Sequence, residues 1–436
     1  MSEKRVDDGQ QQQSPSLTLE DEKSQSSAVE GKTVLTKGQK ILATLQFLTL
    51  CWTLFVAGWN DGTIGPLLPR IQEVYHVNFT IVSLNFIFAC VGFLAGALAN
   101  IYLTDRLGFG KVIVFGSICQ IVAYSIQCSA PPFPVFVLAS AINGVGIAIQ
   151  DAQANGFVGT LSQNAETKMG VLHAAYGVGA FAAPLASTQF ATLPRWSFHY
   201  LVSLGISVMN TAFLILVFRF QGQDACLRKA GEVVPERAED ENSSFSAVMK
   251  TKAVHLLAFF IFVYVGVEVT VGGWIVTYII EVRGGGPSSG YISSGFFGGL
   301  TVGRVILLWV NKTIGERRVM FLYAAIAFGL EFVVWFVPSL IGNAVAISFV
   351  GVLLGPMYPI VMNQTSRILP RYILTGSIGW IAGFGQAGSA VFPFITGAIS
   401  QRHGIKSLQP LLVAMMAFMM FLWALVPRAP RRQLES

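Results

Sequence analysis

Polar side chains that can bind a proton lie inside one of the most apolar stretches of the chain. The segment INGVGIAIQDAQANGF, residues 142–157, places the carboxyl group of Asp151 beside the amides of Gln150 and Asn155. In a helix, Asp151 and Asn155 would lie one turn apart on the same face. Low-dielectric surroundings disfavour a charged carboxylate, so we expect Asp151 to exchange a proton near neutral pH. The alternative is a structural polar contact with a neighbouring helix.

A second carboxyl group, that of Asp61, follows Asn60 in the segment GWNDGTIGPLLP. A membrane helix interrupted by glycine and proline can unwind and expose backbone groups to a cavity. This segment can therefore unwind, and we expect Asp61 to bind a solute or a proton. A capping group at a helix kink is the other interpretation of Asp61.

Further candidates are an acid and several aromatic residues in other apolar stretches. A charged side chain at the centre of a bilayer costs about 2.5–3.5 kcal/mol and usually faces a water-filled cavity, which makes Glu268 a candidate unless it pairs with Arg304. Tyr176, Trp274 and Tyr358 would suit a hydroxylated solute, although aromatic residues also act as packing and interface anchors. The predicted proton-binding residues are Asp61 and Asp151, and the predicted solute-binding residues are Asn60, Asp61, Gln150, Asn155, Glu268, Trp274, Tyr176 and Tyr358.

Three other titratable side chains have no assigned role. Arg304 lies near the end of an apolar stretch, where a long side chain can extend towards water. His173 suits either a pH sensor or a structural contact. Glu331 falls in the apolar stretch at residues 317–337.

Membrane-spanning helices must position these side chains. Of the 436 residues, 53% are hydrophobic and 12% are charged, and the mean hydropathy is +0.59, whereas soluble domains carry about 25% charged residues. Apolar stretches of about 20 residues are long enough to cross a bilayer, and backbone groups in lipid require helices. Twelve spans are predicted, at residues 41–68, 80–103, 110–129, 134–160, 170–192, 198–220, 254–280, 289–310, 317–337, 341–366, 375–398 and 407–427.

Polar segments divide the chain into five parts. Residues 1–40 are rich in Gln and Ser and are predicted to be a disordered cytosolic tail. No cleavable leader is expected, so the first span stays in the protein. The remaining parts are a six-helix bundle at 41–220, a cytosolic central loop at 221–253, a second six-helix bundle at 254–427 and a cytosolic tail at 428–436.

The distribution of basic residues predicts the orientation. Lys and Arg concentrate in the tails and in alternate loops, as the positive-inside rule requires of cytosolic segments. Both termini are therefore expected in the cytosol, and this distribution explains the basic pI of about 9.1 without a nucleic-acid partner. The residues left on the opposite side are Arg70, Arg195, Arg283, Arg402 and Lys406.

The two halves repeat at an offset of 207 residues, which aligns Asp61 with Glu268. Small residues four apart let helices approach closely, and parallel repeats of six helices hold a solute near the membrane midplane between them. The sequence therefore predicts an all-α membrane protein of two pseudo-symmetric bundles. The glycine pairs Gly92/Gly96 and Gly299/Gly303 align at the same offset.

The segment TDRLGFGK, residues 104–111, resembles the loop signature of the major facilitator superfamily. Asp105, Arg106, Gly108 and Lys111 match it, and Ile101 stands where that family has a glycine. The resemblance covers nearly all of residues 41–427 and implies the family's twelve-helix fold. It also implies that these four residues form a conformational latch.

Within that superfamily the chain resembles the fucose-permease branch. The segment QDAQANGF is similar to the fourth helix of those transporters, which implies that Asp151 handles the coupling proton. Asp61 precedes a Leu-Leu-Pro sequence as in the permease, at a longer spacing. The segments LHAAYGVGAFAAPL and LLGPMYP are similar to those of fungal bypass-of-stop-codon-type members.

These patterns favour a secondary active transporter that works by alternating access, with proton symport of a small polar, sugar-like solute. A proton-coupled antiporter that exports drugs or metabolites is the alternative. Gly170, Gly179 and Pro184 resemble the superfamily's antiporter signature, but Ala183, Ser187 and Thr188 stand where that signature has glycines. A non-transporting membrane sensor is the third possibility. The cysteines show no paired spacing, so neither a metal site nor a disulfide framework is predicted.

We expect no enzymatic activity, because no phosphate-binding loop, metal-ligand cluster or nucleophile motif is present in the sequence. The proton replaces any cofactor as the coupling ion. The expected partners are a solute, protons and the lipid bilayer, and the expected state is a monomer in the plasma membrane rather than the vacuolar membrane.

Overall fold

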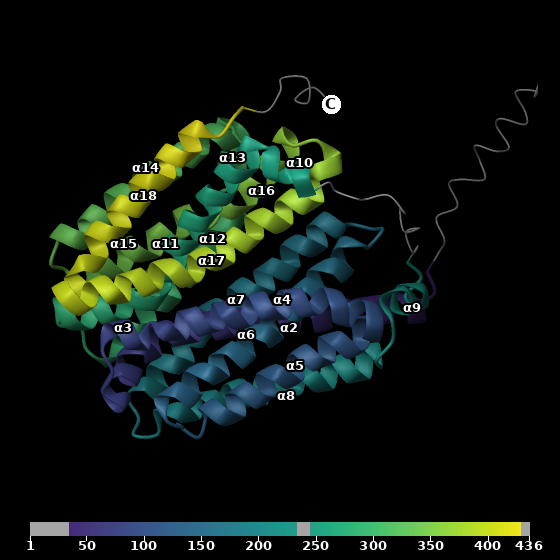
Figure 1. Ribbon diagram of the computed structural model, residues 1–436, viewed down its shortest axis with the longest axis horizontal. Coiled ribbons are helices and arrows are strands. Elements are labelled where there is room, and N and C mark those ends of the chain that lie inside the picture. Colours follow the sequence, from purple (N-terminus) through teal and green to yellow (C-terminus); the bar gives the residue numbers. More distant parts are fainter. Residues whose placement is uncertain (1–34, 233–244, 429–436) are drawn as a thin grey trace, which may run out of the picture.

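The computed structural model describes residues 35–232 and 245–428, which form a bundle of long helices without strands (Figure 1). Within this part of the chain, eleven helices are long and apolar enough to cross a membrane, and a bent pair makes a twelfth span. The predicted all-α membrane fold is therefore confirmed. The predicted N-terminal tail falls almost entirely on residues 1–34, which lie outside the described residues, as do residues 233–244 of the central loop and nearly all of the C-terminal tail.

The first half of the chain contains six spans. Two of them include a short helical turn at their start, and a seven-residue helix, α9 (Gln223–Lys229), follows the sixth. The spans are α2 (Lys37–Tyr75), α3 (Phe79–Val82) with α4 (Leu84–Leu107), α5 (Phe109–Gln127), α6 (Phe133–Gly159), α7 (Ala165–Ala191) and η1 (Trp196–Phe198) with α8 (His199–Phe218).

The second half repeats this arrangement after the short helix α10 (Phe245–Lys250). Its second span is bent by 52° between α12 and α13. The spans are α11 (Lys252–Arg283), η2 (Pro287–Gly290) with α12 (Tyr291–Ile306) and α13 (Leu308–Ile314), α14 (Glu316–Phe336), α15 (Leu340–Leu354) with α16 (Met357–Ile368), α17 (Arg371–His403), and η3 (Ile405–Ser407) with α18 (Leu408–Leu425).

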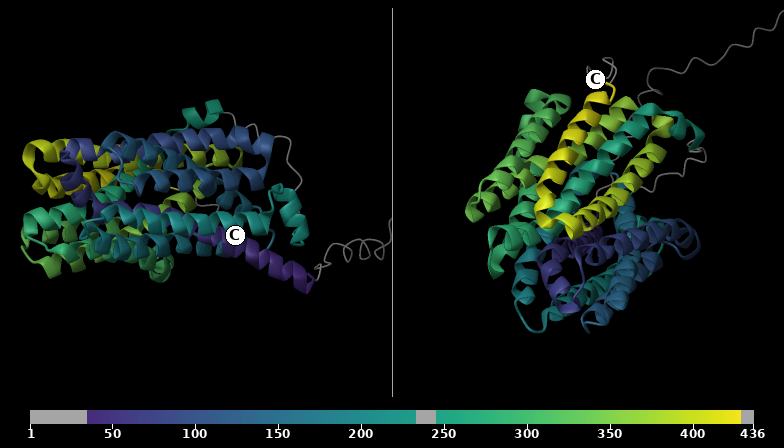
Figure 2. Two further views of the ribbon diagram at one scale, coloured as in Figure 1. Left: turned by 90° about the horizontal axis from the view of Figure 1, so that it is seen from below. Right: turned by 60° about the vertical axis from the view of Figure 1, so that its left-hand side comes forward.

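The two halves use the same helix packing (Figures 1 and 2). Helix α2 packs along α7, and α11 packs along α17. A Cβ atom added to Gly92 or Gly96 would overlap the backbone of α6, and one added to Gly299 or Gly303 would overlap the backbone of α15. The repeated glycine pairs therefore mark equivalent close contacts, as their spacing predicts.

Helix α2 is continuous through its glycines and prolines, so the unwinding that these residues allow near Asp61 does not occur in this structure. Thr36 caps its first turn, and Pro66 and Pro69 lie inside the helix. The glycines serve close packing instead, because a Cβ atom on Gly58 or Gly62 would overlap the backbone of α7. Tertiary contacts along α2 thus stabilise a helix that its composition alone disfavours.

Contacts between the halves concentrate at the end of the bundle opposite the described chain ends. Gln189 on α7 donates a hydrogen bond to the hydroxyl of Tyr291 on α12. The backbone N–H of Phe79 donates to the side-chain oxygen of Gln401 on α17 over 3.2 Å. The ring centroids of Phe79 and Phe86 lie 5.8 and 6.4 Å from that of Trp274 on α11. We call this region the closed end.

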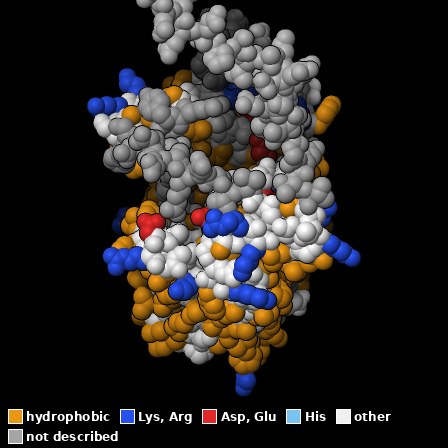
Figure 3. Space-filling view, turned by 90° about the vertical axis from the view of Figure 1, so that its right-hand side faces the viewer, with side chains coloured by type: hydrophobic (Ala, Val, Ile, Leu, Met, Phe, Trp, Pro, Cys, Tyr) orange, Lys and Arg blue, Asp and Glu red, His pale blue; other side chains and the backbone are white. Residues whose placement is uncertain are grey.

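The opposite end, which we call the open end, is hollowed between the halves. Figure 3 shows this face with acidic side chains visible inside the hollow and basic side chains around its margin. Helices α4 and α17 meet near the closed end and diverge towards this face (Figure 1). Within the described residues, the halves are therefore in contact at the closed end and separated at the open end.

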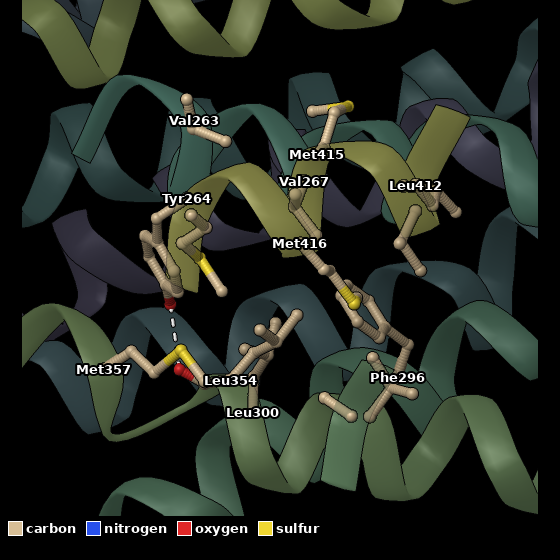
Figure 4. Close-up of a cluster of buried hydrophobic side chains, with 14 of the residues drawn as sticks. Val263, Tyr264, Val267, Phe296, Leu300, Leu354, Met357, Leu412, Met415 and Met416 are labelled. Carbon is tan, nitrogen blue, oxygen red and sulfur yellow. Dashed lines mark hydrogen bonds between the residues drawn. The ribbon is translucent and has the colours of Figure 1, made fainter. Parts of the chain in front are cut away.

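A dense apolar core holds α11 in place beside the hollow (Figure 4). Tyr264 and Val267 on α11 are fully buried, and the Tyr264 hydroxyl donates a 3.0 Å hydrogen bond to the carbonyl of Leu354. Met416 on α18 packs in the same cluster. Burying such side chains contributes about 1.5–3 kcal/mol each, so α11 presents the intervening residues of its other face in a fixed position.

Candidate functional site

Asp61 is held by two hydrogen-bond donors from α2 and α7. The Tyr176 hydroxyl donates to Oδ2 over 2.6 Å, and the Asn60 side-chain amide donates to Oδ1 over 3.0 Å. The Asp61 side chain is exposed although it lies in the middle of a membrane-spanning helix. Both carboxyl oxygens thus accept a charge-assisted hydrogen bond, and the side chain remains accessible from outside the helix packing.

A buried polar pair stands behind Asn60. The Asn143 amide on α6 donates to the Asn60 carbonyl oxygen Oδ1 over 2.5 Å, and the Tyr124 hydroxyl on α5 donates to the same oxygen over 3.3 Å. Asn143 is 4% exposed and Tyr124 is 1% exposed. Sequence analysis missed both residues, although Asn143 lies only about two turns before Asp151 on the same helix.

Asp151 follows Asn143 on α6 by about two turns. The Asn155 amide donates to its Oδ1 and to its backbone carbonyl, each over 2.9 Å. Asp151 is within electrostatic range of Asp61. The structure therefore brings together the two carboxyl groups that the sequence suggested for proton binding.

The second half contributes Glu268 from α11. It lies within electrostatic range of Asp61 and interacts with Tyr264 and Arg304. The ion pairs of the described residues do not include Glu268, so Arg304 is not in direct salt-bridge contact with it. The Arg304 guanidinium instead donates from Nε to the carbonyl of Gly355 over 3.3 Å.

Tyr358 on α16 completes the group from the second half. It lies within electrostatic range of Asp151, Glu268 and Arg304. Side chains from six spans, three in each half, thus converge at the hollow between the halves. We call this group the central cluster, and it consists of Asn60, Asp61, Asp151, Asn155, Tyr176, Glu268, Arg304 and Tyr358.

Two predicted solute-binding residues do not join the central cluster in this conformation. Gln150 is 2% exposed and donates to the carbonyl of Ile113 on α5 over 3.4 Å, because it points about 100° away from Asp151 around the helix. Trp274 is fully buried at the closed end, where its ring N–H donates to the carbonyl of Pro393 over 3.0 Å.

The predicted latch lies at the open end of α4. Gly108 has a positive φ of 79° and ends that helix, a conformation that favours glycine. The Arg106 guanidinium lies 4.5 Å from the centre of the Tyr102 ring. Asp105 and Lys111 are exposed, and Asp105 takes part in none of the ion pairs between described residues.

Two unassigned titratable residues differ in their surroundings. His173 on α7 is exposed and lies within electrostatic range of Arg304 at the margin of the central cluster. Glu331 on α14 is fully buried, and neither of its carboxyl oxygens has a hydrogen-bond partner within residues 35–232 and 245–428. Glu331 lies outside the central cluster.

A separate cavity of about 460 Å³ lies between α7, α12 and α15. Half-exposed apolar side chains such as Val178, Val302 and Phe349 line it, so it opens on the outer surface of the spans. None of the three carboxyl groups of the central cluster reaches it.

The family model described as Major Facilitator Superfamily matches residues 50–393. The chain is 25% identical to the Bypass of stop codon protein 6 of Saccharomyces cerevisiae over 414 residues, which is 89% of this chain and 83% of the relative. It is 21% identical to the Glucose/mannose transporter GlcP of Bacillus subtilis over 353 residues, which is 79% of this chain and 85% of the relative.

Solved structures share the fold. The fucose:proton symporter of E. coli matches with a TM-score of 0.60 at 17% identity, over 90% of this chain and 100% of that chain. A D-xylose-proton symporter matches with a TM-score of 0.73 at 12% identity, over 89% of this chain and 98% of that chain. The family match over most of the sequence, together with the two-bundle fold, shows that the chain belongs to the Major Facilitator Superfamily and is a membrane transporter rather than an enzyme.

Proposed function

We propose that the protein is a secondary active transporter that works by alternating access and carries a small polar, sugar-like solute together with protons. The observation that supports this proposal best is the meeting of Asp61 and Asp151 from the first half with Glu268 from the second. Carboxyl groups that face one another across the moving halves link proton binding to the relative position of those halves.

Electrostatics gives the physical reason for coupling. Like charges at close range disfavour simultaneous ionisation, and the single guanidinium of Arg304 balances only part of the charge of three carboxylates. Closing the hollow around them removes water and raises the cost of the unbalanced charge. Protonation of Asp61 or Asp151 therefore favours closure of the open end.

The chemistry of the central cluster supports a hydroxylated solute. Tyrosine hydroxyls and amide groups can donate to and accept from sugar hydroxyls, and the ring faces of Tyr176 and Tyr358 suit the apolar face of a sugar. The relatives support the same class, since they include a glucose/mannose transporter and a fucose:proton symporter. We retain Asn60, Asn155 and Glu268 as solute-binding candidates.

We infer that the open end faces the cytosol. Basic side chains gather on the described surface beside and below the hollow in Figure 3, and the positive-inside rule assigns such segments to the cytosol. Both chain ends then lie in the cytosol, and the conformation is open to the inside. Asp105, Arg106, Gly108 and Lys111 lie at this same end, where we propose that they act as a latch when the halves close.

Asp151→Asn tests the proposed coupling in proteoliposomes with an imposed proton gradient. We expect the variant to lose proton-driven sugar accumulation while retaining exchange of labelled solute, because a neutral amide mimics the protonated acid but cannot release a proton. Glu331→Gln is the matched control, since Glu331 is a buried acid outside the central cluster, and it should accumulate solute as the wild type does.

Accumulation by Asp151→Asn at the wild-type rate would overturn the role assigned to Asp151. Solute efflux driven by inward proton flow would replace symport with antiport. Wild-type vesicles that move no member of a panel of sugars and polyols, at either of two pH values, would overturn the proposed solute class.

A further inference from the structure

We propose that Asn143 and Tyr124 are positioning residues that fix the amide of Asn60 and thereby direct the coupling proton to one oxygen, Oδ2, of Asp61. This inference rests on the proposed proton coupling and goes beyond it, because it assigns a role to two buried residues that lie behind the solute site. Neither residue contacts Asp61 through a hydrogen bond.

The orientation of the Asn60 amide follows from the donors that surround its oxygen. Asn143 and Tyr124 both donate to Asn60 Oδ1, over 2.5 and 3.3 Å. Asn143 also lies 3.4 Å from the Tyr124 hydroxyl, so the three groups form a closed set. Because the Asn60 oxygen already accepts these two hydrogen bonds, its NH₂ group points to Asp61 Oδ1 and donates to it over 3.0 Å.

An amide NH₂ group donates hydrogen bonds and cannot accept one. A proton placed on Asp61 Oδ1 would face the N–H of Asn60, and the two hydrogens would repel each other. A proton on Oδ2 faces the Tyr176 hydroxyl instead, which can turn from donor to acceptor. The arrangement therefore leaves Oδ2 as the oxygen that takes the proton.

Tyr176 can couple protonation of Asp61 to the packing of a second helix. It belongs to α7, whereas Asp61 belongs to α2, and these two helices pack along each other. Reversal of the hydrogen bond between them would accompany each proton that binds. The other titratable or charged groups that face Asp61 from packed elements are Tyr124 on α5, Asp151 on α6, Glu268 on α11 and, through Glu268 and Tyr176, Arg304 on α12.

The test compares Asn143→Leu with Asn210→Leu. Both remove a buried amide from the first half. Asn210 forms hydrogen bonds with Thr53 and Ser117, and it lies outside the central cluster and does not bond to Asn60. Loss of Asn143 frees Asn60 to turn its carbonyl oxygen towards Asp61, which then satisfies the protonated acid. The expected result is that Asn143→Leu moves the pH of half-maximal uptake upward by about one unit, since a hydrogen bond to a charged group is worth about that much.

An infrared readout isolates Asp61 from the rest of the transport cycle. Subtracting the spectrum at high pH from that at low pH gives the C=O bands of carboxyl groups that become protonated. The band that is present in the wild type and absent in Asp61→Asn belongs to Asp61. We expect that band to persist to higher pH in Asn143→Leu and to be unchanged in Asn210→Leu. If Asn143→Leu does not fold, Tyr124→Phe provides the same comparison with a smaller upward shift, because it removes the longer of the two hydrogen bonds to Asn60, 3.3 Å against 2.5 Å.

The outcomes separate this inference from the proposed function. If Asp61→Asn abolishes proton-driven accumulation but Asn143→Leu and Tyr124→Phe titrate as the wild type does, the positioning role is wrong and the coupling role of Asp61 stands. A lower uptake rate with an unchanged pH profile also contradicts positioning, because a merely structural role predicts that result. If Asp61→Asn accumulates solute normally, proton coupling at Asp61 fails and this inference fails with it.

Discussion

At the scale of single residues, the Asp61 carboxylate is defined by the donors that meet its two oxygens. Tyr176 approaches Oδ2 from α7, and Asn60 approaches Oδ1 from α2, the helix that carries Asp61. Hydrogen bonds to a charged group stabilise it by about 1.5–3 kcal/mol, more than those between neutral groups. Loss of the Tyr176 hydroxyl should therefore affect function more than loss of a comparable hydroxyl elsewhere.

Tyr176→Phe is expected to lower proton-coupled uptake by about 10- to 100-fold, because it removes the donor that becomes an acceptor when Asp61 is protonated. Tyr75→Phe is the matched control. Tyr75 donates to the carbonyl of Pro131 over 2.8 Å, away from the central cluster, so its loss should cost about 0.5–1.5 kcal/mol of stability and leave uptake unchanged. Uptake in vesicles, corrected for the amount of reconstituted protein, measures both. Equal losses in the two variants would contradict a specific role for Tyr176.

At the scale of helices, close packing at glycine explains why the two halves share a repeat. A Cβ atom at Gly92 would overlap the backbone of Ala141, and a Cβ atom at Gly299 would overlap the backbone of Ser348. These glycines occupy equivalent positions in the two halves, at the contacts of α4 with α6 and of α12 with α15. The 207-residue offset between the halves therefore reflects the same close helix packing in each half.

Gly92→Ala should lower the stability of the protein by about 1–3 kcal/mol, because the added methyl group forces two helix backbones apart. Gly299→Ala should have a similar effect. Gly205→Ala is the control, since no atom lies within 4 Å of its added Cβ, and alanine in a helix is preferred to glycine by about 0.5–1 kcal/mol. Thermal unfolding in detergent compares the three variants. A melting temperature for Gly92→Ala at or above that of Gly205→Ala would show that the close contact is not required.

At the scale of the whole molecule, the transporter is closed at one end and hollowed at the other. Gln189 with Tyr291, Phe79 with Gln401, and the aromatic contact to Trp274 join the halves at the closed end. Alternating access requires these contacts to break when the open end closes. Trp274 is thus placed to stabilise the closed end in this conformation, a position that sequence reasoning did not anticipate.

A covalent link across the closed end should stop transport without preventing solute binding from the open end. The test pair is Gln189→Cys with Tyr291→Cys, joined by a short bis-maleimide in a background without the five native cysteines. We expect uptake to fall to background after cross-linking, while calorimetry still detects solute binding. The control pair, Asn164→Cys with Ser366→Cys, lies on exposed positions of the two halves at the open end and should cross-link poorly in this conformation. Full transport after complete cross-linking of the test pair would show that the closed end need not open.

The sequence by itself determined the class of the protein. Apolar stretches of membrane-spanning length predicted the helices at positions close to those observed, because lipid leaves helix formation as the only way to satisfy the backbone. The sequence also singled out Asp61, Asp151 and Glu268 as candidates, because a charged side chain inside the bilayer is costly. Both inferences depend on local composition and on the bilayer, and neither requires knowledge of which helices touch.

Only the tertiary structure decided which side chains meet. Gln150 and Asp151 are neighbours in the sequence, yet one packs against α5 and the other faces the hollow, since successive residues differ by about 100° around a helix. Asn143 and Tyr124 look like ordinary polar residues in apolar stretches until α5, α6 and α2 bring them to Asn60. The glycines and prolines of α2 allow the helix to unwind, but packing of its glycines against α7 keeps it helical. Such contacts join residues far apart in the chain, and hydrophobic patterning does not specify them.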